Sequence, residues 1–372
     1  MIEENKNNSE ENVWLSRAIL KSLQLVIVLV VLGALLIAMA FVEAKTGALA
    51  NFFNKKEEIV LADTTQNKAA KKEEKPDHWV APDLATIPAG EQGEMIKYGR
   101  ELIAHTAKYL GPRGSVMQVS NGMNCQNCHL DAGTKNMGNN YGAVAATYPK
   151  IRARSGAMES MEKRINDCVE RSLNGKALAE DSKEMKAIVA YMKWLGTDVP
   201  KGKAPKGSGI FDLPYLDRPI DPEKGKVLYE QKCASCHQKD GKGTLNMEGT
   251  EYTFPPLWGE HSYNSGAGLY RMSRFAGYIK YNMPLGVTYP DSQLTDEEAW
   301  DIAAYVNTMN RPSKDLSKDW PDISKKPIDH PFGPFADGFD EKQHKYGPFA
   351  PIKKKREEMK KGKEDKAPTS KK

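Results

Sequence analysis

The stretches Cys125-Gln-Asn-Cys128-His129 and Cys233-Ala-Ser-Cys236-His237 decide the fold of this chain. Each is a Cys-x-x-Cys-His motif, which is the attachment sequence of a c-type haem. Two thiols one turn apart can add to the two vinyl groups along one side of a porphyrin, and the histidine that follows can reach the iron. The sequence therefore predicts two covalently bound haem c groups, attached through Cys125, Cys128, Cys233 and Cys236, with His129 and His237 as iron ligands.

The alternatives for this motif pair are a zinc site and a thiol redox site. Zinc modules separate their Cys-x-x-Cys pairs by about 15–20 residues, whereas Cys128 and Cys233 lie 105 positions apart. A thioredoxin-like motif requires a βαβ setting, which the sequence around these cysteines does not show. Haem attachment remains the prediction.

The two motifs belong to an internal repeat. A helical pattern precedes each motif, at residues 94–103 and 222–229, and a capped helix follows each, reaching Tyr191 and Tyr305. Thr295 and Glu298 form a capping-box pattern ahead of the second of these helices. The fold class predicted is mainly α, with two class I cytochrome c-like domains in tandem, preceded by one N-terminal transmembrane helix.

The domain boundaries follow from changes in composition. A Pro/Gly/Lys stretch at 200–207 separates the two modules, and a Lys/Glu/Ala-rich stretch precedes the first one. We expect a cytoplasmic N-terminus at 1–22, a transmembrane helix at 23–42, a charged linker at 43–77, cytochrome c domain 1 with the catalytic haem at 78–200, cytochrome c domain 2 with the electron-transfer haem at 201–311, a Pro/aromatic-rich extension at 312–352 and a basic disordered tail at 353–372.

The apolar run at 23–42 is broken only by Gln24 and is long enough to span a bilayer as one helix. Ala38-Met39-Ala40 resembles a signal cleavage site, so a removed signal peptide is the alternative. Haem c is attached outside the cytoplasm. The sequence therefore predicts an inner-membrane protein with its haem domains in the periplasm, or a soluble periplasmic protein if the signal is cleaved.

The charge of the chain argues against nucleic acid as a partner. The net charge of the 372 residues is +5, but residues 353–372 alone contain ten Lys/Arg and four Asp/Glu. The rest of the protein is therefore close to neutral and has no general basic excess. The tail is expected to be a solvated charge run, with docking to an anionic surface as the alternative.

The sixth iron ligands distinguish the two modules. Met283, in Asn282-Met283-Pro284-Leu285-Gly286, lies 22 residues before Tyr305, in a loop typical of a distal haem methionine. Cys168 lies 23 residues before Tyr191, at the corresponding place in the first module. A buried inert thiol is the alternative for Cys168. Rival ligands for the first haem are Met158, Met161, Met185, Met192 and His105; Met185 and Met192 are expected to be core residues.

Unequal ligands suit an enzyme better than a simple electron carrier. Methionine raises a haem potential and an anionic thiolate lowers it, so a Cys168-ligated haem is expected to be catalytic and the Met283-ligated haem to be the electron exit. Lys and Arg are frequent at 148–156 and 163–172, around Cys168. Beside a thiolate-ligated haem they would attract an anionic substrate.

The sequence resembles the dihaem thiosulfate dehydrogenases, which join two thiosulfates into tetrathionate. The resemblance covers about residues 79–352 and rests on six stretches: Met123-Asn-Cys-Gln-Asn-Cys-His-Leu-Asp-Ala-Gly133, Arg152-Ala-Arg-Ser-Gly156, Arg164-Ile-Asn-Asp-Cys-Val-Glu-Arg-Ser-Leu-Asn-Gly175, Pro255-Pro-Leu-Trp-Gly259, Asn282-Met-Pro284 and Gln343-His-Lys-Tyr-Gly-Pro-Phe-Ala-Pro-Ile352.

This resemblance implies roles for individual residues. Cys168 would be the distal ligand of the active-site haem, and Arg154, Arg164 and Ser172 would line the substrate pocket. Some family members have Lys where this chain has Asn282, so ligand exchange by such a lysine is not expected here.

The expected chemistry is oxidation of thiosulfate through a sulfenyl thiosulfate adduct on Cys168, with an external acceptor such as a cytochrome c. Two other functions remain open at the level of sequence. One is a non-catalytic, membrane-anchored dihaem electron carrier. The other is a haem-thiolate subunit of a sulfur-oxidising complex, which passes sulfur to a carrier protein.

Overall fold

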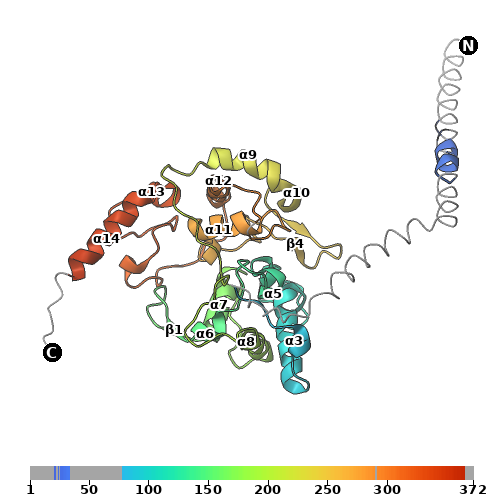
Figure 1. The fold of residues 1–372 in the computed structure, drawn as a ribbon, viewed down its shortest axis with the longest axis horizontal. Coiled ribbons are helices and arrows are strands. Elements are labelled where there is room, and N and C mark those ends of the chain that lie inside the picture. Colours follow the sequence, from blue (N-terminus) through green and yellow to red (C-terminus); the bar gives the residue numbers. More distant parts are fainter. Residues whose placement is uncertain (1–20, 22–23, 25, 34–77, 290, 365–372) are drawn as a thin grey trace, which may run out of the picture. The chain divides into compact units, whose positions relative to one another are not determined.

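The computed structural model describes residues 21, 24, 26–33, 78–289 and 291–364, and Figure 1 shows its helices and strands. The chain divides into two compact units, Met1–Lys75 and Pro76–Lys372. In the first unit the described residues are helical, and the apolar side chains from Val26 to Leu32 are exposed. The predicted anchor at 23–42 lies for the greater part outside the described residues. Within the described part of the chain, no helix has the length and apolarity needed to cross a membrane.

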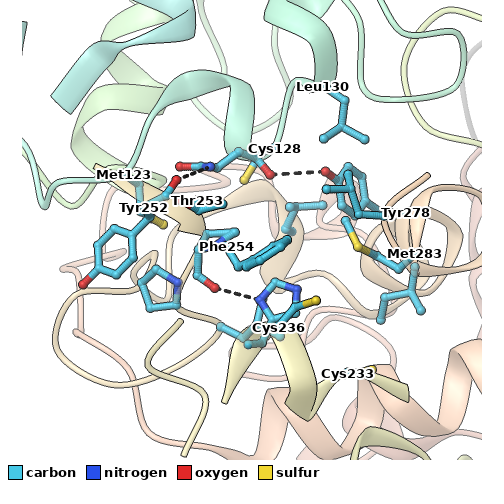
Figure 2. A pocket seen from close by; sticks show the side chains of 18 of the residues that line it. Met123, Cys128, Leu130, Cys233, Cys236, Tyr252, Thr253, Phe254, Tyr278 and Met283 are labelled. Atoms are coloured by element: carbon cyan, nitrogen blue, oxygen red, sulfur yellow. Dashed lines mark hydrogen bonds between the residues drawn. The ribbon is translucent and has the colours of Figure 1, made fainter. Parts of the chain in front are cut away.

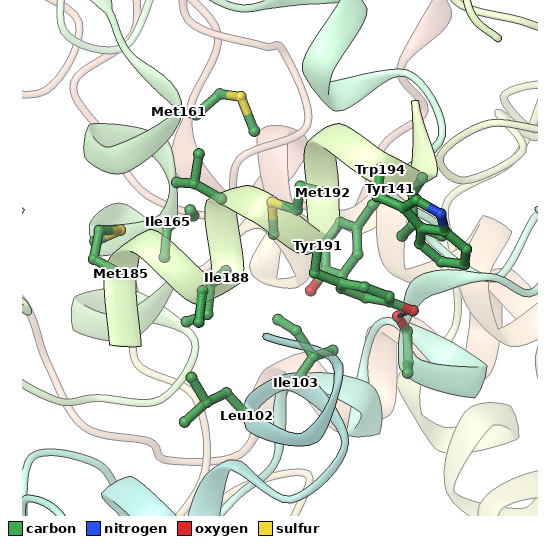
Figure 3. Packing of buried hydrophobic residues seen from close by; sticks show 14 of the residues in the cluster. Leu102, Ile103, Tyr141, Met161, Ile165, Met185, Ile188, Tyr191, Met192 and Trp194 are labelled. Atoms are coloured by element: carbon green, nitrogen blue, oxygen red, sulfur yellow. Dashed lines mark hydrogen bonds between the residues drawn. The ribbon is translucent and has the colours of Figure 1, made fainter. Parts of the chain in front are cut away.

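The first half of the second unit is a small helical module. Its two main helices, α3 (Glu91–Ala104) and α8 (Lys183–Leu195), pack against each other. In Figure 3, Leu102 and Ile103 of α3 point toward α8, which contributes Ile188 and Met192 to the same buried cluster. Shorter elements surround this pair: η1 (Leu84–Thr86), α4 (Thr106–Leu110), η2 (Cys125–Asn127), α5 (Leu130–Gly133), α6 (Val144–Thr147) and α7 (Met161–Arg171).

The second module repeats this plan. Helix α9 (Pro222–Lys232) packs against α12 (Asp296–Thr308), and α11 (Met272–Asn282) packs on the same helix. Trp300 and Tyr229 are fully buried in its core. The second haem motif lies on α10 (Ala234–His237), and η3 (Gly268–Tyr270) leads into α11. The helices predicted before and after each motif are therefore present in both modules.

A close helix crossing occurs at the same place in both modules and confirms the internal repeat. A Cβ on Gly99 of α3 would lie 2.0 Å from the carbonyl oxygen of Ala187 on α8. A Cβ on Gly225 of α9 would lie 1.9 Å from the carbonyl oxygen of Asp301 on α12. Each glycine thus faces the residue four positions before the matching tyrosine, Tyr191 or Tyr305. Only a residue without a side chain lets the two backbones approach so closely.

The ends of the long helices follow from local side chains. Thr295 and Glu298 form the predicted capping box at the start of α12, with the Thr295 hydroxyl accepting from Glu298 N at 3.1 Å. Ser182 caps α8 by accepting from Met185 N. Two short antiparallel hairpins, β1 (Lys150–Ile151) with β2 (Met158–Glu159) and β3 (Thr244–Leu245) with β4 (Tyr252–Phe254), complete the modules.

The segment after α12 adds η4 (Ile323–Lys325), α13 (Glu341–Tyr346) and α14 (Ala350–Glu364) to the second module. The expectation of a disordered tail from residue 353 is wrong for 353–364, which lie in α14. Phe349 and Ile352 are buried in the core of the second module, and the Arg356 guanidinium donates to Asp337. These contacts fix the start of α14 and offset the repulsion within its basic sequence. Residues 365–372 lie outside the described part of the chain.

Candidate active site

The two Cys-x-x-Cys-His motifs line two adjoining cavities, and residues of the first motif line both. The Met283 cavity, of about 390 Å³, is lined by Cys233, Cys236, His237 and Met283. The Cys168 cavity, of about 480 Å³, is lined by Cys128, His129, Cys168 and a ring of cationic residues. Three residues line both: Cys128, Tyr263 and Leu269.

The Met283 cavity is suited to an electron-transfer haem. Figure 2 shows Cys233, Cys236 and Met283 around one space, together with the rings of Phe254 and Tyr278. His237 is buried, and its Nδ1 lies 2.8 Å from the carbonyl oxygen of Pro255. Burial lowers the pKa of His237, and the bond to Pro255 only partly opposes this. A neutral imidazole held through Nδ1 leaves Nε2 for iron.

In the Cys168 cavity, His129 is oriented in the same way. Its Nδ1 lies 2.5 Å from the carbonyl oxygen of Asn139, and its ring stacks on Tyr141 at 4.4 Å. Cys168 and His129 line the same cavity, and the nearby His129 side chain helps to lower the pKa of the Cys168 thiol. The structure therefore brings Cys168 to His129 across the space beside the first attachment motif. A haem bound at this motif would have the side chains of both residues within its cavity.

The donor sets fit two haem c groups. The Met283 cavity is lined by the thiols of Cys233 and Cys236, by His237, whose Nδ1 is held by a carbonyl oxygen, and by the Met283 thioether. The Cys168 cavity is lined by Cys128 of the first motif, by His129, held in the same way, and by the Cys168 thiol. The cysteines do not form a site for a bare metal ion. Within the described residues, no group of three or more His, Cys, Asp or Glu is placed to hold one.

None of the rival ligands of the first haem lines the described part of the Cys168 cavity. Met161, Met185 and Met192 are buried in the core cluster of the first module, as expected for Met185 and Met192. Met158 is 62% exposed. His105 contacts Glu251 at 3.1 Å and lines the other cavity.

The Cys168 thiol is set up to be a thiolate. Burial raises its pKa, but the charge of Arg164 and hydrogen bonds from His129 and Arg164 outweigh burial and lower the pKa to about 6. Arg164 Nη1 donates to Cys168 Sγ at 2.9 Å. The thiolate in turn raises the pKa of Arg164 above its ordinary value, against the effect of burial. Among the described residues no carboxylate forms an ion pair with Arg164, so Cys168 is its counter-charge.

A ring of cations surrounds this pair. Besides Arg164, the cavity lining contains Arg152, Arg154, Arg171, Arg271, Arg274 and Lys325. Burial lowers the pKa of Arg154 to about 10, with the nearby charge of Arg171 adding to the effect. Several of these charges are balanced, since Arg171 binds Asp319 and Arg271 binds Asp329. The remaining excess favours a small anion with more than one negative charge.

The C-terminal extension closes one side of the cavity. Arg171 donates twice to Asp319, at 2.8 and 2.9 Å. Trp320 donates from its backbone N to the carbonyl oxygen of Arg154, whose guanidinium lies 4.6 Å from the Trp320 ring. Trp320 and His330 line the cavity together. Sequence reasoning missed these residues. Their only signal was an aromatic-rich segment without a helical period.

The predicted site residues thus come together. Arg154, Arg164, Cys168 and Ser172 all line the Cys168 cavity. Ser172 follows the last residue of α7, with its backbone N bonded to the carbonyl oxygen of Cys168. Asn282 is buried, and its amide donates to the carbonyl oxygens of Met137 and Tyr278. This side chain therefore joins the two modules beside Met283.

Comparison with known proteins identifies the modules. Residues 115–200 match the SoxA/TsdA cytochrome c domain, and residues 222–310 match the cytochrome c domain. Two tandem cytochrome c domains, each with its own attachment motif, make this protein a dihaem c-type cytochrome with two covalently bound haems. The chain belongs to the thiosulfate dehydrogenase family.

Individual relatives support this assignment. The thiosulfate dehydrogenase of Allochromatium vinosum is 43% identical over 235 residues, which cover 62% of this chain and 83% of the relative. That of Psychrobacter arcticus is 40% identical over 243 residues, covering 64% and 71%. A solved structure, the thiosulfate dehydrogenase (TsdBA) from Marichromatium purpuratum in its as-isolated form, is 35% identical with a TM-score of 0.59. The match covers 64% of this chain and half, 50%, of that longer chain.

Proposed function

We propose that this protein oxidises two thiosulfates to tetrathionate in the Cys168 cavity and passes two electrons to an external acceptor such as a cytochrome c. The observation that carries the proposal is the Arg164–Cys168 pair, in which the pKa of a half-buried thiol is lowered to about 6 inside a cavity lined by cations. Family membership supports thiosulfate as the substrate.

Bringing two dianions together is the main electrostatic cost of the reaction. Two unit charges 4 Å apart repel by about 4 kcal/mol at an effective dielectric constant near 20. Arg164 has no carboxylate partner among the described residues, and Arg154, which shares Asp319 with Arg171, lines the same cavity. Both can offset this repulsion through forked hydrogen bonds to sulfonate oxygens. Ser172, at the end of α7, can add a hydroxyl donor.

Cys168 is proposed as the nucleophile. In the first half-reaction its thiolate and the outer sulfur of thiosulfate form an S–S bond with loss of two electrons, which gives Cys–S–S–SO3⁻. In the second, the outer sulfur of another thiosulfate attacks the sulfonate-bearing sulfur of this adduct. The Cys168–sulfur bond breaks, tetrathionate leaves, and the thiolate is regenerated, as in disulfide exchange. Arg164 stabilises the thiolate both as nucleophile and as leaving group.

The two haems supply one-electron acceptors for the first half-reaction. We propose that His129 and Cys168 would hold the iron of the first haem, and that His237 and Met283 would hold that of the second. A neutral thioether raises a haem potential relative to an anionic thiolate. The two cavities share lining residues, which supports transfer from the first haem to the second.

A steady-state assay in both directions tests the proposal. The purified haem-loaded protein is given thiosulfate with a soluble acceptor, and separately tetrathionate with a reductant. We expect one tetrathionate for every two thiosulfates consumed and two electrons accepted, with no carrier protein present. Electron transfer without tetrathionate would return the chain to the role of electron carrier. A strict need for a sulfur-accepting protein would favour a subunit of a sulfur-oxidising complex.

For localisation, we propose that the haem domains lie in the periplasm and that residues 23–42 anchor the chain in the inner membrane. The support is the apolar length of this span and the site of haem c attachment outside the cytoplasm. N-terminal sequencing of the mature protein tests the anchor. A sequence that begins near Phe41 would contradict it and would favour a cleaved signal.

A further inference from the structure

His330 is a buried histidine in the wall of the Cys168 cavity that no expected step of the reaction uses. It comes from the C-terminal extension and is 2% exposed. Its ring packs against Trp320 at 4.7 Å and Phe332 at 5.3 Å. Nδ1 is buried without a hydrogen-bond partner, and no described residue bonds to Nε2.

An unpartnered ring nitrogen in this position needs a physical explanation. A buried polar group that gives up water without gaining a new partner destabilises the fold, and native proteins rarely leave such groups unsatisfied. Trp320 and Phe332 offer the imidazole no acceptor. The cavity that His330 lines is the place from which a partner can come.

The surroundings keep His330 neutral. Burial lowers its pKa to about 3; Asp329 opposes the shift, and the charges of Arg154, Arg271 and Lys326 add to it. A neutral imidazole carries one N–H. In a cavity that already holds several cations, it can donate one directed hydrogen bond to an anion without adding charge.

His330 lies at a different part of the cavity from the nucleophile. Cys168 contacts Arg164 at 2.9 Å, whereas the His330 ring packs on Trp320 at 4.7 Å. The Arg154 guanidinium lies 4.6 Å from the other partner of this contact, the Trp320 ring, and therefore belongs to the His330 end of the cavity. A sulfonate joined to Cys168 by one sulfur atom must stay near Arg164.

We propose that His330 is a positioning residue for the second thiosulfate, the one that attacks the Cys168 adduct. Its ring N–H donates a hydrogen bond to a sulfonate oxygen of that thiosulfate, whose charge is balanced by Arg154. The outer sulfur is then free to face the adduct. This inference rests on the proposed function, because it assigns the incoming substrate of the same reaction to the Arg154–His330 end of the cavity.

Disulfide exchange alone can isolate this step. The haem-loaded protein is incubated with excess tetrathionate, so that the Cys168 thiolate breaks the central S–S bond, retains Cys–S–S–SO3⁻ and releases thiosulfate. Small molecules are removed once intact mass shows complete loading. Thiosulfate is then added over a range of concentrations, and adduct loss and tetrathionate release are followed. No electron acceptor takes part, so haem potentials do not enter.

The key variant is His330→Phe, which keeps an aromatic ring and removes both nitrogens. We expect the thiosulfate concentration for half-maximal discharge to rise about ten- to hundredfold, as for loss of a hydrogen bond to a charged group. The rate at saturation and the haem spectrum should stay close to wild type. His330→Gln, which restores a donor, should recover most of the loss. The exposed histidine variant His261→Asn is the matched control and should behave as wild type.

The inference is overturned if His330→Phe needs the same thiosulfate concentration as wild type for half-maximal discharge. In that case discharge of the wild-type adduct would still support the proposed function. If wild type forms no adduct at all, the proposed function itself fails. If His330→Phe does not fold, His330→Ala and His330→Gln are compared instead. Only a donor role predicts that the thiosulfate concentration for half-maximal discharge is higher in the Ala variant than in the Gln variant. Equal behaviour of these two would also overturn the inference.

Discussion

Arg164 Nη1 lies 2.9 Å from the Sγ atom of Cys168, one turn further along the same helix. Because α7 sets this spacing, the cation and the thiol keep their relation regardless of what enters the cavity. The pair is held in place at the base of α7 by Ser160, which caps the helix by accepting from Lys163 N. The helix therefore presents a preformed thiolate with its own counter-charge.

Replacing Arg164 by Gln should weaken substrate use while leaving both covalent haems attached. The guanidinium makes a charge-assisted bond to Cys168 and is free of carboxylate partners among the described residues. Loss of such a bond costs about 1.5–3 kcal/mol, so kcat/KM for thiosulfate should fall about ten- to hundredfold. Steady-state kinetics measure this, and a haem stain checks attachment. Unaltered kcat/KM would remove Arg164 from the substrate site.

Replacing Cys168 by Met should abolish thiosulfate oxidation without loss of haem. A thioether can bind haem iron, so two covalent haems and a folded first module are expected. The first haem should move to a higher potential, because a neutral ligand replaces an anionic one. A thioether can neither form the adduct nor act as its leaving group. Turnover near wild type, measured beside a redox titration, would end the catalytic-cysteine mechanism.

Replacing Cys233 and Cys236 by Ala should remove one covalent haem and leave one. The two cysteine pairs lie in different cytochrome c domains, so attachment to Cys125 and Cys128 should not depend on the second pair. A haem stain on a denaturing gel and the intact mass give the count. Two haems in this variant would contradict the assignment of one haem to each module.

Replacing Asp319 by Ala should destabilise the fold and loosen the cavity wall. Asp319 is 8% exposed and binds Arg171 through both oxygens. Removing one partner of a buried pair costs about 3–5 kcal/mol, because the other charge is left unpaired. Chemical denaturation should show this loss. The control Asp240→Ala removes an exposed carboxylate paired with Lys242 and should leave stability within error of wild type.

Lys326 should make stability depend on alkaline pH. Burial lowers the pKa of this amine to about 8, from 10.5 in the unfolded chain. Between these values the unfolded state binds more protons, so the cost of burying the charged amine is present below pH 8 and is relieved as pH rises toward 10.5. Relative to Lys326→Met, which cannot titrate, wild type should gain stability between pH 7 and pH 10. The prediction is contradicted if the free energy of unfolding changes with pH by the same amount in both proteins.

Sequence reasoning located the parts of the site that local patterns encode. The attachment motifs, the capping box at Thr295 and the repeat spacing that singled out Cys168 all act over a few residues or one module. The alignment of Cys168 with Met283 was informative because two copies of one helical plan lie in a single chain. Placing Cys168 beside His129 required no contact between modules.

The rest of the site depends on contacts that no local pattern reports. Arg171 and Asp319 are separated by 148 positions, and their pairing follows from how the extension crosses the first module. Trp320 and His330 lie in a segment without periodicity, so their burial could not be foreseen. The same applies to α14. Its basic sequence predicts a solvated segment, and only the structure shows that Ile352 is buried.

The crossing of the C-terminal extension has a consequence for biosynthesis. Asp319, Trp320 and His330 are made after both cytochrome domains, yet they close the cavity that belongs to the first. A growing chain can therefore acquire the structure needed for haem attachment well before it can hold substrate. The wall of this cavity can be completed only after every residue of both cytochrome domains has been synthesised.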